Sequence, residues 1–280
     1  MENRIVMAIQ RYGLSAADPV RVTADRAVMF AESPEFGPVV LKLDLDRLQL
    51  DRECHMLQAL EGKGACRVYA YEEAEEIRGR NRRGRYALML QERILPGISL
   101  RAEKNPERRL AVFSKVFQSI HRQDCFGAEY RDWLDGIVKF CQMYQEGTGL
   151  EKQAKKAFSI CVELEEKYRE TCLLHGDLHH DNILLRNDGS YAVIDPKAVT
   201  GPAILDTPRF LLNELGMGEA DEETHIRRCI RMLSQLLGYP EEDLCKAFYM
   251  ETVLANIWYL EDGLELKPKD LELAERFLTE

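Results

Sequence analysis

The pattern of apolar and polar positions in residues 1–95 predicts a small sheet with one helix before it and one helix inserted into it. The opening MENRIVMAIQRYG has charged residues among its apolar ones, which favours an amphipathic helix over a signal peptide. Leu50, Cys54 and Leu57 recur at helical spacing, so residues 46–60 are predicted to form the inserted helix. Strands are predicted at residues 19–23, 27–31, 36–43, 67–71 and 85–90, with a solvated hairpin loop over 78–84 between the last two.

The pattern becomes mostly helical from residue 105 onward. Asn105 followed by Pro106 is a typical helix start, and further helices are predicted over 133–144, 152–172, 222–237, 241–262 and 268–279. Residues 173–200 interrupt this pattern with an apolar run, a polar turn and two strands joined by an Asn-Asp-Gly turn at 187–189. Asp206, just before Pro208, is predicted to be a helix N-cap.

Length and composition allow one large domain or two lobes, and they exclude some classes of partner. The chain has 280 residues, of which 45% are hydrophobic, and no apolar run approaches the length of a membrane span. The eight cysteines are scattered without a C-x-x-C pair, which favours reduced core residues over a zinc site. We therefore expect a cytoplasmic protein without a membrane partner. Nothing in the sequence indicates its oligomeric state.

The formal net charge of −10 is concentrated near the C-terminus, where residues 214–280 hold 16 acidic and 7 basic side chains. Such an excess of acid argues against nucleic acid or an anionic membrane as a partner. It is compatible with a small cationic substrate. An acidic solvated surface accounts for it equally well.

The chemistry is concentrated in LLHGDLHHDNILLRNDGSYAVIDPKAVT, residues 173–200. Here His175-Gly-Asp177 precedes Asn182, and Asp195 ends the following apolar strand. A hairpin with this spacing brings three oxygen-bearing side chains to one end of a small sheet, which suits phosphoryl transfer with Mg²⁺. Asp- and Asn-rich turns are common, so an isolated H-x-D is weak evidence, whereas all three features together are specific.

The spacing matches the H-R-D-x-x-x-x-N and D-F-G motifs of protein kinases, written here as His-Gly-Asp and Asp-Pro-Lys. This version resembles the aminoglycoside phosphotransferase-type small-molecule kinases. The longer strings LLHGDLHHDNILL and AVIDPKAVTGPAILD look most like the branch with streptomycin 6-kinases and hydroxyurea kinases.

The resemblance implies an α+β, protein-kinase-like bilobal fold. Residues 1–95 would form a small antiparallel-sheet lobe that binds the nucleotide, residues near 91–97 a linker, and residues 96–280 a mostly helical lobe for catalysis and substrate. It also implies transfer of the γ-phosphate of a Mg²⁺-nucleotide (ATP, with GTP not excluded) to a hydroxyl of an aminoglycoside-like molecule. The alternatives are a metabolic kinase acting on a sugar, an amino alcohol or a hydroxyurea-type acceptor, and a nucleotide-binding pseudokinase.

The resemblance assigns a role to each residue of the two motifs. Asp177 is the expected base, which orients the acceptor hydroxyl and takes its proton late. Asn182 and Asp195 are the expected metal ligands, and His175 is expected to hold the loop through ring hydrogen bonds. Lys197 replaces the glycine of D-F-G, where a cation can contact the γ-phosphate. His179 and His180 are interpreted as loop-packing residues, and Asp206 as a brace for the loop.

The nucleotide side is predicted from Lys42, which lies among apolar residues in the third strand. By itself such a lysine is more often a solvated charge, but beside the downstream motifs it is interpreted as a phosphate ligand. Glu53 falls on the inner stripe of the following helix and is its expected partner, with Glu61 as a rival.

In the linker, Gln91, Glu92 and Ile94 are expected to present backbone groups to the adenine ring. No G-x-G-x-x-G lies between the first two strands, where the sequence reads VTADRAVMF. How the phosphates are covered therefore stays open.

The acceptor side is predicted from Trp258, Glu261 and Asp262, which resemble the Trp-x-x-Glu-Asp-Gly ending of this branch. The two acids are candidates for binding an ammonium or guanidinium group. From the sequence alone, an aromatic core anchor is the slightly favoured interpretation of Trp258, and a solvated charge that of Glu261.

Overall fold

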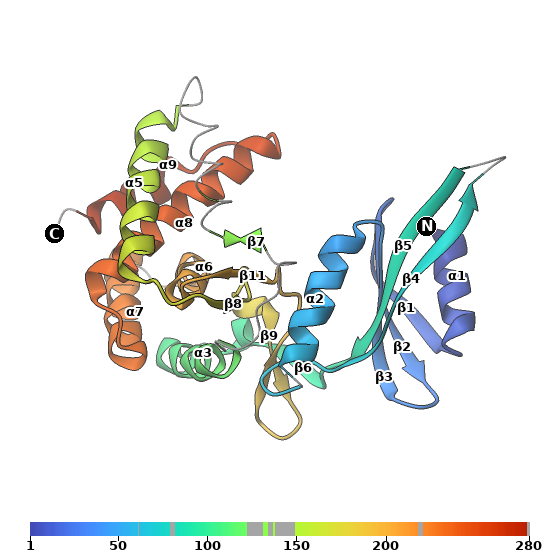
Figure 1. Cartoon of the computed structure of the whole chain (residues 1–280). Coiled ribbons are helices and arrows are strands. Elements are labelled where there is room, and N and C mark those ends of the chain that lie inside the picture. The colour runs from blue at the N-terminus through green and yellow to red at the C-terminus, as the bar shows by residue number, and fades with distance from the viewer. Residues whose placement is uncertain are drawn as a thin grey trace. The chain divides into compact units, whose positions relative to one another are not determined.

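The computed structural model describes residues 1–60, 62–78, 82–121, 131–133, 137, 149–217 and 221–278. The chain divides into two compact units (Figure 1). The first unit contains residues 1–98 and 184–197, and the second contains residues 99–183 and 198–280. The first unit therefore includes a hairpin that is distant in sequence from the rest of it.

The first unit is built on a five-stranded antiparallel sheet in the order β1-β2-β3-β5-β4. The predicted strands are all present, but β4 and β5 are longer than expected, because their backbone ladder continues to the pair Arg78–Arg82. The prediction of a loop was therefore wrong for residues 78 and 82–84, because backbone pairing continues through the charged positions of both strands, while residues 79–81 lie outside the described ranges. The strands are β1 (Ser15–Val22), β2 (Arg26–Ser33), β3 (Gly37–Asp44), β4 (Val68–Arg78) and β5 (Arg82–Glu92).

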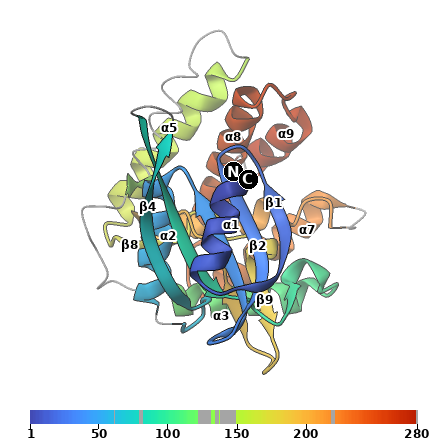
Figure 2. The same cartoon turned by 90° about the vertical axis from the view of Figure 1, so that its right-hand side faces the viewer.

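Two helices cover opposite faces of this sheet, as Figures 1 and 2 show. Helix α1 (Glu2–Arg11) packs Ala8 on an apolar cluster that includes Leu41 and Leu88. Helix α2 (Arg47–Ala59) turns Leu50, Cys54 and Leu57 inward, and its N-cap Asp46 accepts a hydrogen bond from the backbone N–H of Gln49. Because strand side chains alternate between the two faces, Leu41 faces α1 whereas its neighbour Lys42 faces α2.

The hairpin of β9 (Ile183–Arg186) and β10 (Tyr191–Val193) pairs with β6 (Pro96–Ser99) in a three-stranded sheet. Its predicted turn at residues 187–189 is confirmed, with Gly189 at φ +83°. Backbone bonds from Cys66 N to Val193 O (3.0 Å) and from Val193 N to Gly64 O (2.9 Å) join the hairpin to the first unit. The Arg186 guanidinium adds an ion pair with Glu92.

The second unit is mostly helical, as the sequence predicts, and with the antiparallel sheet of the first unit it makes the fold α+β. Helix α8 is buried along most of its length, and its buried positions include polar side chains such as Glu251 and Asn256 among the apolar ones. The helices are α3 (Pro106–Ile120), α5 (Glu151–Lys167), α6 (Pro208–Leu212), α7 (Glu222–Leu237), α8 (Glu241–Glu261) and α9 (Pro268–Arg276), with 3₁₀ turns η1 (Leu100–Ala102), η2 (His180–Asn182) and η3 (Ala203–Asp206).

A small sheet in the order β7-β11-β8 supports the loop that follows Leu174. Its strands are β7 (Arg131–Asp132), β8 (Cys172–Leu174) and β11 (Val199–Gly201). The helix predicted over 152–172 ends earlier, at Lys167, because Cys172 pairs with Gly201 as a strand residue. The predicted N-cap Asn105 is confirmed, since its side chain accepts from the N–H groups of Glu107 and Arg108. Most of the helix predicted over 133–144 lies outside the described residues.

Among the helices of the described ranges, none combines the length and the apolar character needed to cross a bilayer. The six cysteines in these ranges are all free thiols, and five of them are buried.

Candidate active site

In the first unit, Lys42 lies between two carboxylates. Its Nζ, carried by β3, donates to Glu53 Oε1 on α2 and to Asp195 Oδ1 after β10. Lys42 and Glu53 are only 6% and 5% exposed. Burial alone lowers the pKa of Lys42, but Glu53 and Asp195 together raise it, so the ammonium form is favoured. The predicted Lys42–Glu53 pair is therefore present, while the rival Glu61 lies outside the described residues.

Asp195 and Lys197 occupy the end of the hairpin. The Asp195 side chain is 52% exposed, so its carboxylate is accessible to a ligand while it contacts Lys42. Its backbone has φ +57°, a left-handed conformation that is unusual outside glycine and is often found at functional sites. The side chain of Lys197 is exposed, and its carbonyl accepts from Gln49 Nε2 on α2 at 3.4 Å.

The predicted linker residues continue from β5. Gln91 is 2% exposed and is paired in register with Val40 of β3. Ile94 is 5% exposed, and a Cβ at the following Gly97, which has φ +70°, would come within 2.6 Å of the Ile94 carbonyl oxygen. This close approach requires glycine where the chain turns into β6.

The carboxylate of Glu92, a further linker residue, is bound by other residues of the first unit. It accepts from the backbone N–H of Arg67 at 3.1 Å and from the Arg186 guanidinium of the hairpin. The Glu92 side chain therefore fixes the hairpin to the sheet.

In the second unit, Asp206 holds the start of the loop of residues 175–182. Its carboxylate accepts from the backbone N–H groups of His175 and Gly176, both at 2.7 Å, and contacts His121 Nε2 at 2.8 Å. Burial would raise the pKa of Asp206, but these hydrogen bonds hold it below its usual range. The predicted brace is confirmed. The predicted helix N-cap was wrong, because Asp206 lies in η3 and Thr207 is the N-cap residue of α6.

Hydrogen bonds within the loop orient Asp177 and Asn182. The ring Nδ1 of buried His175 accepts from Asp177 N at 3.2 Å, in keeping with the structural role expected for this histidine. Asn182 Nδ2 donates to the Asp177 carbonyl oxygen at 2.9 Å and lies 3.3 Å from His179 Nε2. Because the amide nitrogen of Asn182 makes these contacts, the amide oxygen of the same side chain is the atom that can act as a ligand.

A buried polar cluster holds the other end of the loop, and sequence reasoning missed it. His180 stacks on Phe210 with ring centres 4.1 Å apart, and its Nε2 lies 2.7 Å from Glu214 Oε1. Glu214 also accepts two hydrogen bonds from Arg109 of α3, at 2.8 and 2.5 Å, and lies 2.8 Å from His225 Nε2 of α7. One carboxylate thus connects η2 with two helices. The sequence gives no signal for it, since the partners lie far apart along the chain.

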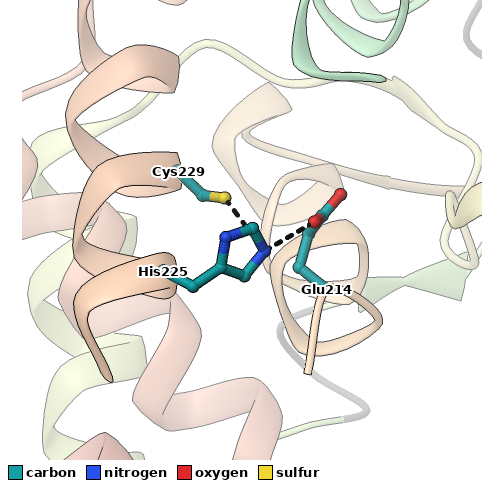
Figure 3. Close-up of side chains that lie close together, drawn as sticks. All are labelled: Glu214, His225 and Cys229. Carbon is teal, nitrogen blue, oxygen red and sulfur yellow. Dashed lines mark hydrogen bonds and ion pairs between the residues drawn. The ribbon is translucent and has the colours of Figure 1, made fainter. Parts of the chain in front are cut away.

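Figure 3 shows Glu214, His225 and Cys229 close together, within the reach of a shared metal ion. Burial would raise the pKa of Glu214, but its bonds to Arg109, His180 and His225 lower it strongly. A metal ion bound to Glu214 would lie beside the Arg109 guanidinium and be repelled by it. The cluster is therefore better explained as a neutralised structural network.

A cavity of about 390 Å³ adjoins Asp177 within the second unit. Trp258 is not part of its described lining but lies under Arg209, whose Cζ is 4.6 Å from the indole ring. Glu261 and Asp262 are exposed at the end of α8 and are also absent from that lining. The described lining residues are Arg101, Asp177, His179, Arg209, Leu212, Asn213, Leu215, Ala255, Asn256, Tyr259, Lys267 and Asp270.

An antiparallel sheet with a buried Lys–Glu pair, and a helical unit with a His-Gly-Asp loop, define the protein-kinase-like fold, and solved structures agree. The amicoumacin kinase hAmiN, in complex with AMP-PNP, Ca²⁺ and Ami, matches with a TM-score of 0.68 at 14% identity over 99% of this chain and 92% of its own. A thermostable mutant of aminoglycoside phosphotransferase APH(4)-Ia, in a ternary complex with AMP-PNP and hygromycin B, gives a TM-score of 0.65 at 13% identity over 98% of this chain and 95% of its own. Choline kinase LicA from Streptococcus pneumoniae gives 0.66 at 14% over 99% and 98%. At these identities the likeness shows the fold alone.

Comparison of the sequence with known families identifies the family within this fold. Residues 11–263 match the family model described as aminoglycoside/hydroxyurea antibiotic resistance kinase, and the chain therefore belongs to this family of small-molecule phosphotransferases. A streptomycin 3''-kinase from Klebsiella pneumoniae is 29% identical over 111 residues, which is 38% of this chain and 42% of the relative. That match thus spans less than half the length of the curated relative.

Proposed function

We propose that this protein transfers the γ-phosphate of a Mg²⁺-nucleotide, ATP in the first instance, to a hydroxyl of an aminoglycoside-like molecule. The observation that carries the proposal is the buried Lys42, which contacts both Glu53 and the exposed metal-ligand candidate Asp195. A strand lysine paired with a helix glutamate is the arrangement that protein kinases use at the nucleotide phosphates, with an aspartate nearby to hold the metal. Family membership supports the same reaction.

The chemistry of the side chains fits a divalent metal and a nucleotide. Asp195 and Asn182 offer the hard oxygen atoms that Mg²⁺ prefers, and Lys42 and Lys197 offer positive charge. A bound Mg²⁺ neutralises charge on the phosphoryl group during transfer. Because the Glu92 carboxylate is already bound to Arg186, we assign recognition of the base to backbone groups of residues 91–94.

On the acceptor side, Asp177 is the proposed base. It lines the cavity, and Asp206 and His175 fix the backbone of its loop. An ionised aspartate is a weak base, so it orients the acceptor hydroxyl and takes the proton late, as the bond to the leaving phosphate weakens. Glu261 and Asp262, exposed at the end of α8, remain our candidates for contacts with a cationic part of the acceptor.

The charges of the cavity favour a second class of acceptor. Its described lining has three cationic side chains, Arg101, Arg209 and Lys267, and two acidic ones, Asp177 and Asp270. A polycationic aminoglycoside meets repulsion from such a lining, whereas a neutral sugar or hydroxyurea does not, and an amino alcohol with one positive charge meets less of it. Phosphorylation of a small metabolite is therefore the runner-up function.

A panel of acceptors tests the proposal. Nucleotide turnover with Mg²⁺ is measured alone and with streptomycin, other aminoglycosides, hydroxyurea, sugars and amino alcohols. We expect an aminoglycoside to accelerate turnover in the wild type, with Asp177→Ala and Asp195→Ala inactive. Acceleration only by neutral metabolites would move the assignment to the runner-up. Wild-type activity in Asp195→Ala would contradict the proposed metal site.

A further inference from the structure

Arg209 makes contacts that the established motifs do not explain. It lies in α6, just after the Asp206 brace, and lines the cavity beside Asp177. Its Nη2 is 2.6 Å from Glu251 Oε1 of α8, and its Nε is 3.6 Å from Asp177 Oδ1. The guanidinium also lies over the indole of Trp258, with Cζ 4.6 Å from the ring centre. One planar cation thus contacts a buried acid, the proposed base and an aromatic ring.

Glu251 is the buried acid that binds the Arg209 guanidinium. It is 2% exposed, and burial raises its pKa to about 7 against the lowering effect of Arg209. Asp177 and Asp206 raise this pKa further, so three carboxylates lie close enough to influence one another. Arg209 contacts two of them directly, and its positive charge offsets their repulsion.

The Nε of Arg209 is buried and has no hydrogen-bond acceptor among the described residues. A buried donor without an acceptor is costly, and the Asp177 carboxylate lies 3.6 Å from this Nε. A small rotation of either side chain would complete this bond. Such a bond limits the orientations that the Asp177 carboxylate can take beside the cavity.

We propose that Arg209 is a positioning residue for phosphoryl transfer, held by Glu251 and Trp258 so that its guanidinium fixes the Asp177 carboxylate at the acceptor hydroxyl. The inference rests on the proposed function, because it gives Asp177 the role of base. It also gives Trp258 a role in the site, as the surface on which the guanidinium lies rather than as a contact of the acceptor. Cations commonly stack on indole rings in this way.

The test compares Arg209→Met, Arg209→Lys and wild type with an acceptor that the panel identifies. Arg209→Met keeps much of the side-chain volume and removes the charge. We expect its kcat to fall by about 100-fold, the loss typical of a misplaced reacting group, with an unchanged KM for the nucleotide. Arg209→Lys keeps the charge but not the planar fork, so we expect a loss of about 10-fold.

Arg227→Met is the matched control. Arg227 of α7 also lies over an aromatic ring, with its Cζ 4.6 Å from the Phe277 ring centre, and it also contacts a glutamate, with Nη2 2.9 Å from Glu223. It lies outside the described lining of the cavity. We expect wild-type kcat for this variant. A similar loss of kcat in Arg227→Met, or wild-type kcat in Arg209→Lys, would overturn the proposal, and the lysine variant carries the test alone if Arg209→Met does not fold.

A structural measurement separates this inference from the proposed function. If no acceptor accelerates turnover in the wild type, the proposed function fails, but the position of the Asp177 side chain is still measurable. Crystal structures of wild type and Arg209→Lys are expected to show a different rotamer or a raised displacement parameter for the Asp177 carboxylate. An unchanged, equally ordered carboxylate would show that Arg209 does not position it.

Discussion

Lys42 is a single cation bound by acids from two distant parts of the chain, Glu53 and Asp195. Glu53→Gln keeps the shape of the pair but removes one charge, so we expect Lys42 to turn further toward Asp195 and away from the proposed phosphate site. We expect kcat/KM for the nucleotide to fall by roughly 10- to 100-fold, because the lysine is misplaced. Steady-state kinetics at varied nucleotide concentration measure the change. Glu73→Gln, at an exposed ion pair with Arg47, is the control and is expected to behave as wild type.

Glu251 makes stability depend on pH. Burial raises its pKa to about 7 from the ordinary 4.5, so between these values the folded protein holds a proton that the unfolded chain releases. Stability from this residue is therefore fully present below pH 4.5 and is lost as the pH rises through 7. Relative to Glu251→Gln, the free energy of unfolding of the wild type should fall by about 3 kcal/mol across this window. Urea denaturation of both proteins from pH 4.5 to 8 measures the difference, and parallel curves would contradict it.

At the scale of elements, Glu214 joins the segment after α6 to α3, to α7 and to the loop of residues 175–182. Its ion pair with Arg109 is almost completely buried, with side chains 0% and 2% exposed. Glu214→Gln removes the carboxylate that binds the buried Arg109 guanidinium, so we expect a loss of about 3–5 kcal/mol in the free energy of unfolding. Chemical denaturation measures the loss.

The same two helices offer a matched exposed pair. Arg228 of α7 binds Glu107 of α3 at 2.5 Å, but these side chains are 52% and 58% exposed. Glu107→Gln is therefore expected to change stability by less than about 1 kcal/mol, because water screens the pair. Equal losses for Glu107→Gln and Glu214→Gln would show that burial of the charge is not the cause.

The sequence predicted those elements whose signals are local. Helix caps such as Asn105, the turn at residues 187–189 and the spacing of Asp177, Asn182 and Asp195 all lie within short windows, where period and turn chemistry apply. Glu214 and Arg209 could not be predicted, because their partners lie on other elements and follow no periodic pattern. Likewise, the sequence predicted Cys172 as the end of a helix. Its pairing with β11 depends on tertiary contacts, which the local pattern does not show.

At the scale of the whole chain, the spacing of the motifs predicted the fold class. It did not predict which residues form each of the two units. The hairpin of residues 184–197 is separated from the first unit by more than eighty residues of sequence, yet it belongs there, through bonds such as Arg186 to Glu92 and Val193 to Gly64. Composition and periodicity do not indicate that a distant segment such as this hairpin packs on an earlier unit. Only the resemblance to kinases implied that Asp195 and Lys42 act together.

Because a ligand that binds only the folded state stabilises the whole molecule, the proposed nucleotide site predicts a change in global unfolding. Mg²⁺ and a non-hydrolysable ATP analogue at 100 times its Kd should raise the free energy of unfolding by about 2.7 kcal/mol, seen as a higher Tm. Excess EDTA should remove most of this gain if the nucleotide binds through the metal, as we propose for Asn182 and Asp195. Asp195→Asn should remove it as well, while Asp188→Asn, in the exposed turn of the same hairpin, should retain it. A gain that survives both EDTA and Asp195→Asn would mean that the nucleotide binds without these ligands, and that the role given to Asp195 is wrong.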